Sequence, residues 1–174
     1  MTTLKDTVQI DVRYSAWATG RLLEACAALS SDERQRNLGV SHGSIVNTLH
    51  HIHISERFWI GCLRADRIPS LDEMRAAPSP AALSFDDLVQ LWPPQWTQIH
   101  HWLETASDET LSQTLPFDLS PGKRFDCPRW QIVRHIVNHA TLHRGQIVGM
   151  IRALGKKPPC VDYIEYELRS RSLL

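Results

Sequence analysis

Hydrophobic positions repeat with helical spacing over four long stretches of the chain. From 5 to 29, apolar side chains recur about every 3.6 residues and no proline intervenes. From 44 to 64 they follow alternating steps of four and three, which is typical of a helix packed in a bundle. Similar patterns predict a third helix over 84–106 and a fourth over 128–154. The fold class predicted is all-α, a four-helix bundle.

Polar and helix-breaking residues set the limits of the third and fourth helices. Ser84 with Asp87 resembles a capping box that starts the third helix. Pro93 and Pro94 interrupt it, and a proline inside a helix costs about 3 kcal/mol. We therefore expect a kink or a break near Trp92. Pro128 opens the fourth helix, and Gly155 ends it.

The segments between helices differ in length and in the structure they predict. Three prolines mark 65–83 as a loop, long enough to run the length of a helix and to return the chain parallel to it. Within 107–127 we expect a small β-hairpin, because Pro-Gly at 121–122 favours a type II turn. The tail from Asp162 is expected to form a short helix. A chain of 174 residues with no internal repeat fits a single domain over 1–174.

Charge and cysteine content narrow the setting in which the protein works. Lys plus Arg equals Asp plus Glu, 19 against 19, which argues against a binding surface for nucleic acid or for an anionic membrane. No apolar run approaches the roughly 20 residues that span a bilayer, and the N-terminus lacks the apolar core of a signal peptide. The four cysteines form no CxxC pair. We expect a cytoplasmic protein with reduced thiols and with neither a nucleic-acid nor a membrane partner.

Histidines are the unusual feature of the composition. There are nine, and seven of them lie in 42–53 and 135–143. On the fourth helix His139 and His143 are four residues apart, so both lie at or beside the core face and about 6 Å apart along the axis. A helix chelates one metal ion with this spacing, while His135 lies farther from the core face.

The second helix offers a partner for this pair, but periodicity does not decide which histidine it is. His50 points outward, whereas His51 and His53 lie on opposite flanks of the apolar seam. Clustered imidazoles beside a core need partners for both ring nitrogens, and a metal ion supplies them. Histidines that only pack and hydrogen-bond within the bundle are the alternative.

Other polar residues near these positions are candidates for supporting roles. Glu56 is the one charged residue in the seam of the second helix, which makes it the nearest candidate acid or base. His135, Asn138 and Gln146 could orient metal ligands through hydrogen bonds. The chain has no HExxH, no Glu-x-x-His, no GxSxG, no Walker A and no GxGxxG motif.

Several motifs together resemble the DinB/YfiT-like family of metal-dependent enzymes. The most specific is HIVNHATLHRGQ at 135–146, which is similar to the family's HxxNHxxxHRGQ. Three further segments match, namely Tyr14-Ser-Ala-Trp17-Ala, then Gly43-Ser44-Ile45 with Thr48-Leu49-His50-His51-Ile52, and finally Leu154-Gly155 with Asp162-Tyr163. The resemblance covers nearly the whole chain.

The resemblance carries expectations about the site and the assembly. It implies that His51, His139 and His143 are the three metal ligands, which favours His51 over His53. It also implies an up-down-down-up bundle and a homodimer. Members that resemble this chain include transferases and isomerases that use thiols, so it further implies a small-molecule substrate, with a low-molecular-weight thiol as cosubstrate.

Three neutral histidines leave at least one coordination position for water or substrate, as in catalytic zinc sites. Zinc, nickel and iron(II) all accept such ligands. We therefore expect a metal-dependent transferase or hydrolase. A metal-binding or sensing module without turnover, and a purely structural or interaction bundle, are the alternative hypotheses.

Overall fold

Four long helices carry most of the chain, and polar caps start three of them. The computed structural model describes residues 2–174. The long helices are α1 (Leu4–Ala27), α3 (Ile45–Ala65), α5 (Phe85–Thr105) and α7 (Arg129–Ala153). Thr3, Ser44 and Ser84 cap α1, α3 and α5 by accepting a backbone N–H of the first turn. The all-α prediction is confirmed.

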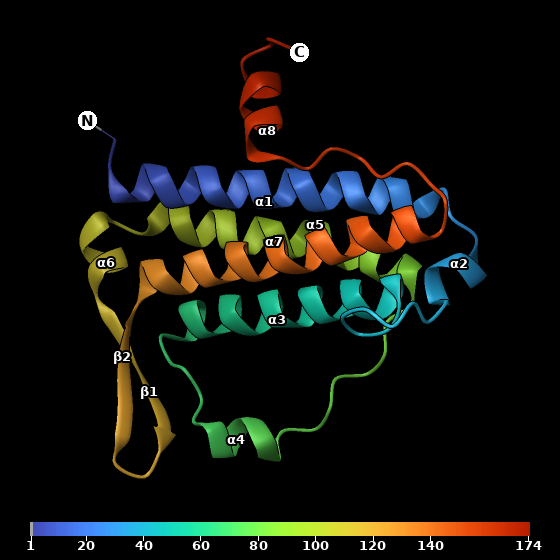
Figure 1. Cartoon of the computed structure of the whole chain (residues 1–174). Helices are drawn as coiled ribbons and strands as arrows, with labels where there is room; N and C mark the ends of the chain where they lie inside the picture. The colour runs from blue at the N-terminus through green and yellow to red at the C-terminus, as the bar shows by residue number, and fades with distance from the viewer. Residues whose placement is uncertain (1) are drawn as a thin grey trace.

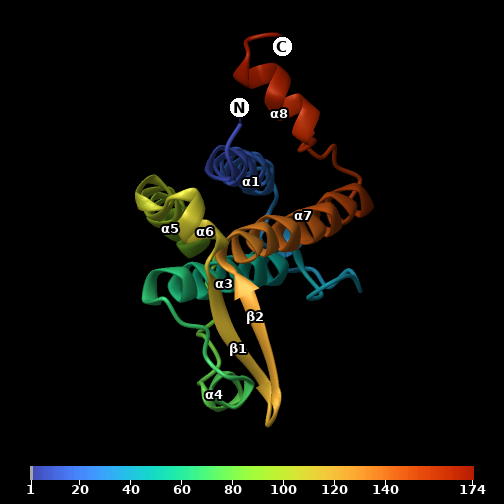
Figure 2. The same ribbon diagram turned by 90° about the vertical axis from the view of Figure 1, so that its left-hand side faces the viewer.

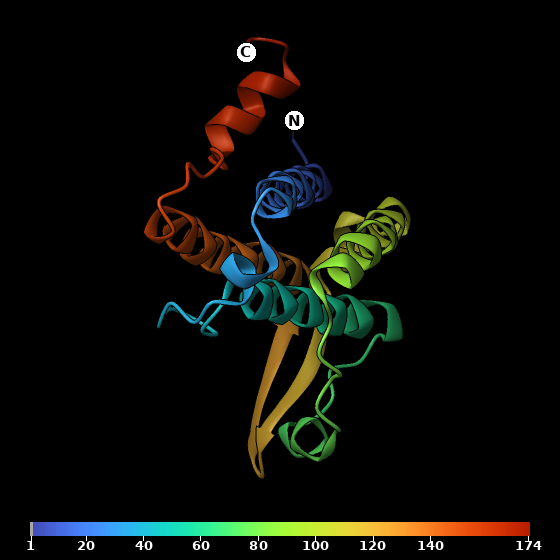
Figure 3. The same ribbon diagram turned by 90° about the vertical axis from the view of Figure 1, so that its right-hand side faces the viewer.

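The four helices run in an up-down-down-up order around a shared core. In Figure 1, α1 and α7 run from left to right, whereas α3 and α5 run from right to left. The end views in Figures 2 and 3 place α3 beside α7 and α5, with α1 on the far side of the core. The connection from α3 to α5 returns along the bundle and contains the short helix α4 (Leu71–Ala76). The expected crossover is therefore present.

Three further short helices and one hairpin complete the chain. The helices are α2 (Ser31–Gln35), α6 (Asp108–Ser112) and α8 (Tyr163–Ser170). Strands β1 (Thr114–Ser120) and β2 (Lys123–Pro128) pair antiparallel, with Phe117 opposite Phe125. Gly122 has φ +75°, as the turn predicted from Pro-Gly requires. The hairpin and α4 project from the α3 side of the bundle, and α8 projects beyond α1 (Figure 2).

A kink or a break was expected near Trp92; helix α5 is continuous through its two prolines, so the break does not occur, and the kink stays a prediction. Pro93 and Pro94 lack the N–H groups that would bond the carbonyls of Val89 and Gln90, and all four residues are exposed, so water can satisfy those carbonyls. On the opposite side, Trp92 is fully buried and fixes α5 against α3. Tertiary packing therefore outweighs the local preference.

Polar contacts, in addition to the apolar core, hold the helices together. Arg144 of α7 is buried and donates to the Ser15 carbonyl and to the Ser15, Thr19 and Thr141 hydroxyls. At the end where α3 finishes and α7 begins, Arg129 forms an ion pair with Asp66. These contacts fix α7 against both α1 and α3.

None of the described helices contains an apolar stretch long enough to cross a bilayer.

Candidate metal centre

The antiparallel pair α3 and α7 brings three histidines together. His51 lies on α3, and His139 and His143 lie one turn apart on α7. The Nε2 atoms of His51 and His139 are 3.0 Å apart. The ring centroid of His143 is 4.5 Å from that of His139 and 4.7 Å from that of His51. The rings of the three residues expected to be metal ligands therefore lie together, although the histidines whose ligand nitrogens all lie within 4.8 Å of one another are His42, His51 and His143, without His139. The role of His51, His139 and His143 as ligands stays a prediction.

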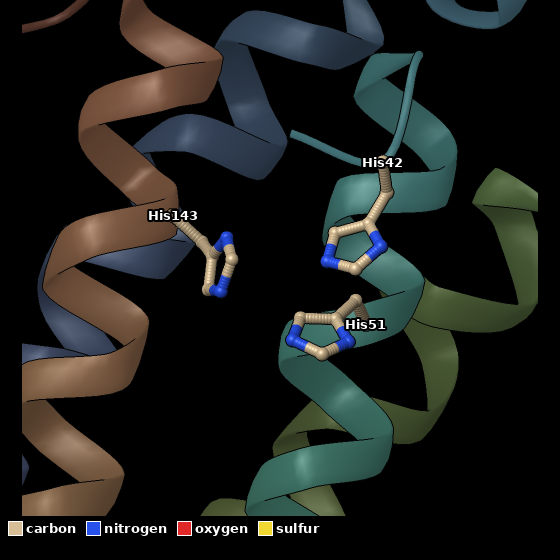
Figure 4. A group of neighbouring side chains, drawn as sticks. All are labelled: His42, His51 and His143. Atoms are coloured by element: carbon tan, nitrogen blue, oxygen red, sulfur yellow. The ribbon is translucent and has the colours of Figure 1, made fainter. Parts of the chain in front are cut away.

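A fourth histidine joins this cluster from the loop that precedes α3. The ring of His42 stacks on that of His51, with centroids 3.9 Å apart, and one ligand nitrogen from each of His42, His51 and His143 lies within 4.8 Å of the others. Figure 4 shows these three side chains facing one another across the gap between α3 and α7. Sequence reasoning missed His42, for which the only signal was its place in the histidine-rich stretch 42–53.

The loop that carries His42 has a defined conformation. Gly39 and Gly43 have φ of +68° and +86°, values that glycine adopts without steric cost. The N–H of Leu38 donates to the Gly43 carbonyl at 2.7 Å, which closes the loop. Asn47 of α3 donates through Nδ2 to the carbonyl of His42 at 3.3 Å. The position of His42 is therefore fixed by the loop backbone and by the first turn of α3.

Hydrogen bonds orient the ring of His143. Its Nδ1 lies 2.7 Å from Oε1 of Gln146 and 3.2 Å from Oγ of Ser41. Because an amide oxygen only accepts, Nδ1 of His143 carries the proton and donates it to Gln146. The lone pair on Nε2 is then free for a metal ion, which is the arrangement that oriented metal-binding histidines have.

Burial favours the neutral form of His42, His51 and His139. It lowers the pKa of His51 and of His139 to about 4, and the neighbouring histidines lower both pKa values further. Burial also lowers the pKa of His42. At neutral pH these rings are therefore in the uncharged form that binds metals.

The residues present fit a divalent ion. Nitrogen ligands about 2.1 Å from one tetrahedral ion lie about 3.4 Å apart, so the 3.0 Å between Nε2 of His51 and Nε2 of His139 needs only a small adjustment. A donor set of neutral imidazoles suits zinc, nickel and iron(II). Nδ1 of His139 is buried and finds no hydrogen-bond partner among residues 2–174, so this cluster is not a fully satisfied set of packed side chains.

Comparison with known proteins agrees with this arrangement. The profile of the DinB family matches residues 2–171. The chain belongs to the DinB family. It is also similar to Protein DinB of Bacillus subtilis (strain 168), with 21% identity over 154 residues that cover 86% of this chain and 87% of that protein. Family membership and the histidine cluster together fit a metal-binding DinB-like protein.

Of the other histidines of α3, neither joins the cluster of this DinB-family chain. His53 is 2% exposed and lies against Trp92 of α5, with ring centroids 5.3 Å apart. Its backbone carbonyl accepts from Gln95. The structure thus places His51 on the α7 side of α3 and His53 on the α5 side, a choice that periodicity alone left open.

The expected supporting residues occupy different environments. Glu56 is 3% exposed and accepts hydrogen bonds from Trp92 and Gln95 of α5 at 2.8 and 3.0 Å, so its carboxylate faces the core between α3 and α5. Its expected catalytic role stays a prediction, and its position gives that role no support. Asn138 is exposed, while Gln146 contacts His143 as described.

His135 connects the cluster to an apolar groove. Its ring centroid is 5.6 Å from that of His139 and 5.2 Å from that of Trp59. A groove of about 320 Å³ runs from His135 between α3, α7 and the hairpin. The groove is lined by Trp59, Ile68, Phe117, Leu119, Phe125, Cys127, Gln131, Ile132 and His135. Cys127 is one of four free cysteines, and burial raises the pKa of its thiol.

A second, larger cavity lies elsewhere on the DinB-family chain. It has a volume of about 410 Å³ and lies between α2 and the first turns of α3 and α5, where Arg34, Asn47 and Asp86 contribute to its wall. No histidine lines it. Size alone favours this cavity as a binding site, but the chemistry favours the groove beside His135.

Proposed function

We propose that this DinB-family protein binds one divalent metal ion through His51, His139 and His143 and is a metal-dependent enzyme that acts on a small molecule. The proposed reaction is transfer of a low-molecular-weight thiol, or hydrolysis. The observation that carries the proposal is the three-imidazole cluster between α3 and α7, in which Nε2 of His51 and Nε2 of His139 approach to 3.0 Å and burial lowers the pKa of both rings. The substrate, the thiol and the homodimer stay predictions.

A divalent ion bound to these histidines would lower the pKa of a thiol or a water and polarise a carbonyl of the substrate. The protein's own contribution is to hold the imidazoles in a form that can bind the ion. Gln146 holds the proton of His143 on Nδ1, and burial keeps His51 and His139 uncharged. His51 and His139 therefore need no proton loss at neutral pH before they bind an ion.

The apolar groove supports a substrate with a hydrophobic part. The ring of Trp59 lies beside those of both Phe117 and His135 in the wall of the groove, and the ring of His135 lies beside that of His139. A substrate that buries an apolar or aromatic group there would hold its reacting atoms toward the histidine cluster and would exclude water from its apolar part. The proposed substrate class is a small molecule with one apolar end and one electrophilic end.

A metal-binding module without turnover is the second candidate function. The observation that favours it is His42, because four protein ligands are typical of closed, structural metal sites, whereas catalytic sites keep one position open.

Metal content tests the first part of the proposal. Protein purified without a nickel column is expected to contain about one divalent ion per chain by elemental analysis, and His139→Ala is expected to lose it because a ligand is removed. His101→Ala is the matched control, since His101 is exposed on α5. Equal metal content in His139→Ala and the parent, or a parent that binds no divalent ion after reconstitution, would contradict the proposal.

Turnover tests the second part. The metal-loaded parent is expected to accelerate conjugation of low-molecular-weight thiols to electrophiles, or ester and amide hydrolysis, and His139→Ala is expected to be inactive in the same assays. A parent that binds the ion but matches His139→Ala across the whole panel would favour the module without turnover.

A further inference from the structure

We propose that His42 is a fourth imidazole ligand of the ion held by His51, His139 and His143, and that it is a replaceable ligand. This inference rests on the proposed function, since it concerns the same ion. It adds a ligand from outside α3 and α7. It also means that, in the free protein, a substrate must displace a histidine to reach the ion.

The first argument is the position of the nitrogen atoms. One ligand nitrogen from each of His42, His51 and His143 lies within 4.8 Å of the other two. In Figure 4 the rings of His42 and His51 each turn a nitrogen toward His143. Nitrogens around one tetrahedral ion lie about 3.4 Å apart, so the separations among the nitrogens of His42, His51 and His143 need to shrink by at most about 1.4 Å. Movement of the surface loop that carries His42 can supply part of this change.

The second argument is that the loop is held both at the histidine cluster and at the first turn of α3. Ser41 contacts Nδ1 of His143 through its hydroxyl at 3.2 Å, and Asn47 holds the carbonyl of His42. Ser41 has φ +54°, an uncommon value for a residue other than glycine. The loop therefore accepts a less favourable backbone conformation while placing two consecutive side chains on the histidine cluster.

Stacking alone is the competing explanation for the position of His42. A ring that only covers His51 could be replaced by any aromatic ring, and its nitrogens would have no role. The nitrogen that faces His143 distinguishes the two explanations, because only a ligand needs that atom.

Exposure makes His42 replaceable where the other three histidines are not. His42 is an exposed residue of a loop, whereas His51 and His139 are partly buried and His143 is buried on helices of the bundle. His42 can leave the ion without repacking the core, so a thiol or other donor can take its place. A four-imidazole resting site on this chain would then be closed to solvent but open to a stronger ligand.

Cobalt(II) reports on this shell directly, because its visible absorption depends on the number and type of its ligands. Metal-free protein is titrated with Co²⁺, and affinity is measured by competition with a chelator. His42→Phe keeps a stacking ring and loses both nitrogens; it is expected to weaken Co²⁺ binding about 10-fold or more and to alter the visible bands. His42→Ala is expected to behave like His42→Phe, and His101→Phe like the parent.

The outcomes separate this inference from the proposed function. If His42→Phe retains the affinity and spectrum of the parent while His139→Ala loses Co²⁺, His42 only stacks and the inference is wrong, but the proposed function stands. If the parent itself fails to bind Co²⁺, the proposed function fails and this inference fails with it. Far-UV circular dichroism of each variant establishes that the helices are retained, as expected for a loop substitution.

Discussion

Gln146 determines which nitrogen of His143 faces the histidine cluster. We predict that Gln146→Ala weakens divalent-metal binding by about 10- to 100-fold, because nothing but Ser41 then holds the proton on Nδ1. Gln146→Glu is expected to retain most of the affinity, since a carboxylate also accepts from Nδ1. The measurement is chelator competition, with Gln90→Ala on the exposed side of α5 as the control. Equal affinities for Gln146→Ala and the parent would show that Gln146 does not orient the ligand.

Glu56 lies in the core, where its carboxylate contributes to stability. Its carboxylate accepts from Nε1 of Trp92 and Nε2 of Gln95. We predict that Glu56→Ala lowers the free energy of unfolding by about 2 to 4 kcal/mol, because both donors lose their acceptor inside the bundle. Glu56→Gln is expected to cost far less, since an amide oxygen can accept both hydrogen bonds. Urea titration measures both variants.

The difference in the free energy of unfolding between Glu56→Gln and the parent should depend on pH. Burial raises the pKa of Glu56 above its ordinary 4.5, while the hydrogen bonds from Trp92 and Gln95 and the charge of Arg144 act in the opposite direction. Between the unfolded and folded pKa values the folded state binds more protons, so the parent loses stability as pH rises through that window. Gln does not titrate, so the stability of Glu56→Gln relative to the parent should rise from pH 5 to pH 8. A constant or falling difference would contradict the raised pKa.

At the scale of elements, the two prolines destabilise α5 locally, and the packing of its buried side compensates for this. Pro94 lies on the exposed side of the helix and leaves the Gln90 carbonyl without its helical donor. We predict that Pro94→Ala raises the free energy of unfolding by about 1 to 2 kcal/mol in urea titrations, after the greater freedom of the unfolded chain is counted. Pro78→Ala, in the non-helical crossover, should give no such gain. A loss of stability in Pro94→Ala would mean that the proline shapes the helix for packing.

The long elements were predictable because each has its signal within its own residues. Ser44 and Ser84 are caps, Gly155 adopts φ +73° at the end of α7, and Pro-Gly forms the hairpin turn. The short helices α2, α4 and α6 were missed, although Ser30 with Glu33 and Ser70 with Glu73 form capping boxes at the first two. Helices of five or six residues are too short for an apolar repeat to be detected.

The candidate site was predictable only where it lies on helices. Periodicity brought His139 and His143 to one side of α7, but the choice between His51 and His53 depended on which neighbour each flank of α3 meets. His42 depends on a loop whose path is set by the left-handed residues Gly39, Ser41 and Gly43. No repeat in the sequence encodes such a path, so its contact with His51 follows only from the folded chain.

At the scale of the whole molecule, the crossover topology places the cluster and the groove on the same pair of helices. Because α3 and α5 run parallel, α3 has α7 as its antiparallel neighbour, and the hairpin that precedes α7 projects beside α3 (Figure 1). The hairpin thereby supplies Phe117 and Phe125 to the groove that His135 also lines, and the ring centroid of His135 lies 5.6 Å from that of His139. A hairpin inserted into a four-helix bundle can thus place apolar side chains beside a histidine cluster.

The distance between His51 and His139 along the chain, 88 residues, bears on how the protein is made. A ribosome that adds 5 to 20 residues per second needs about 4 to 18 seconds to travel from one to the other. During that interval the nascent chain displays only two of the four clustered imidazoles, those of His42 and His51, so the proposed site is incomplete. If the proposed ion is held by these histidines, its capture therefore waits until His139 and His143 have been synthesised, and a metal found in the proposed site marks a chain translated beyond residue 143.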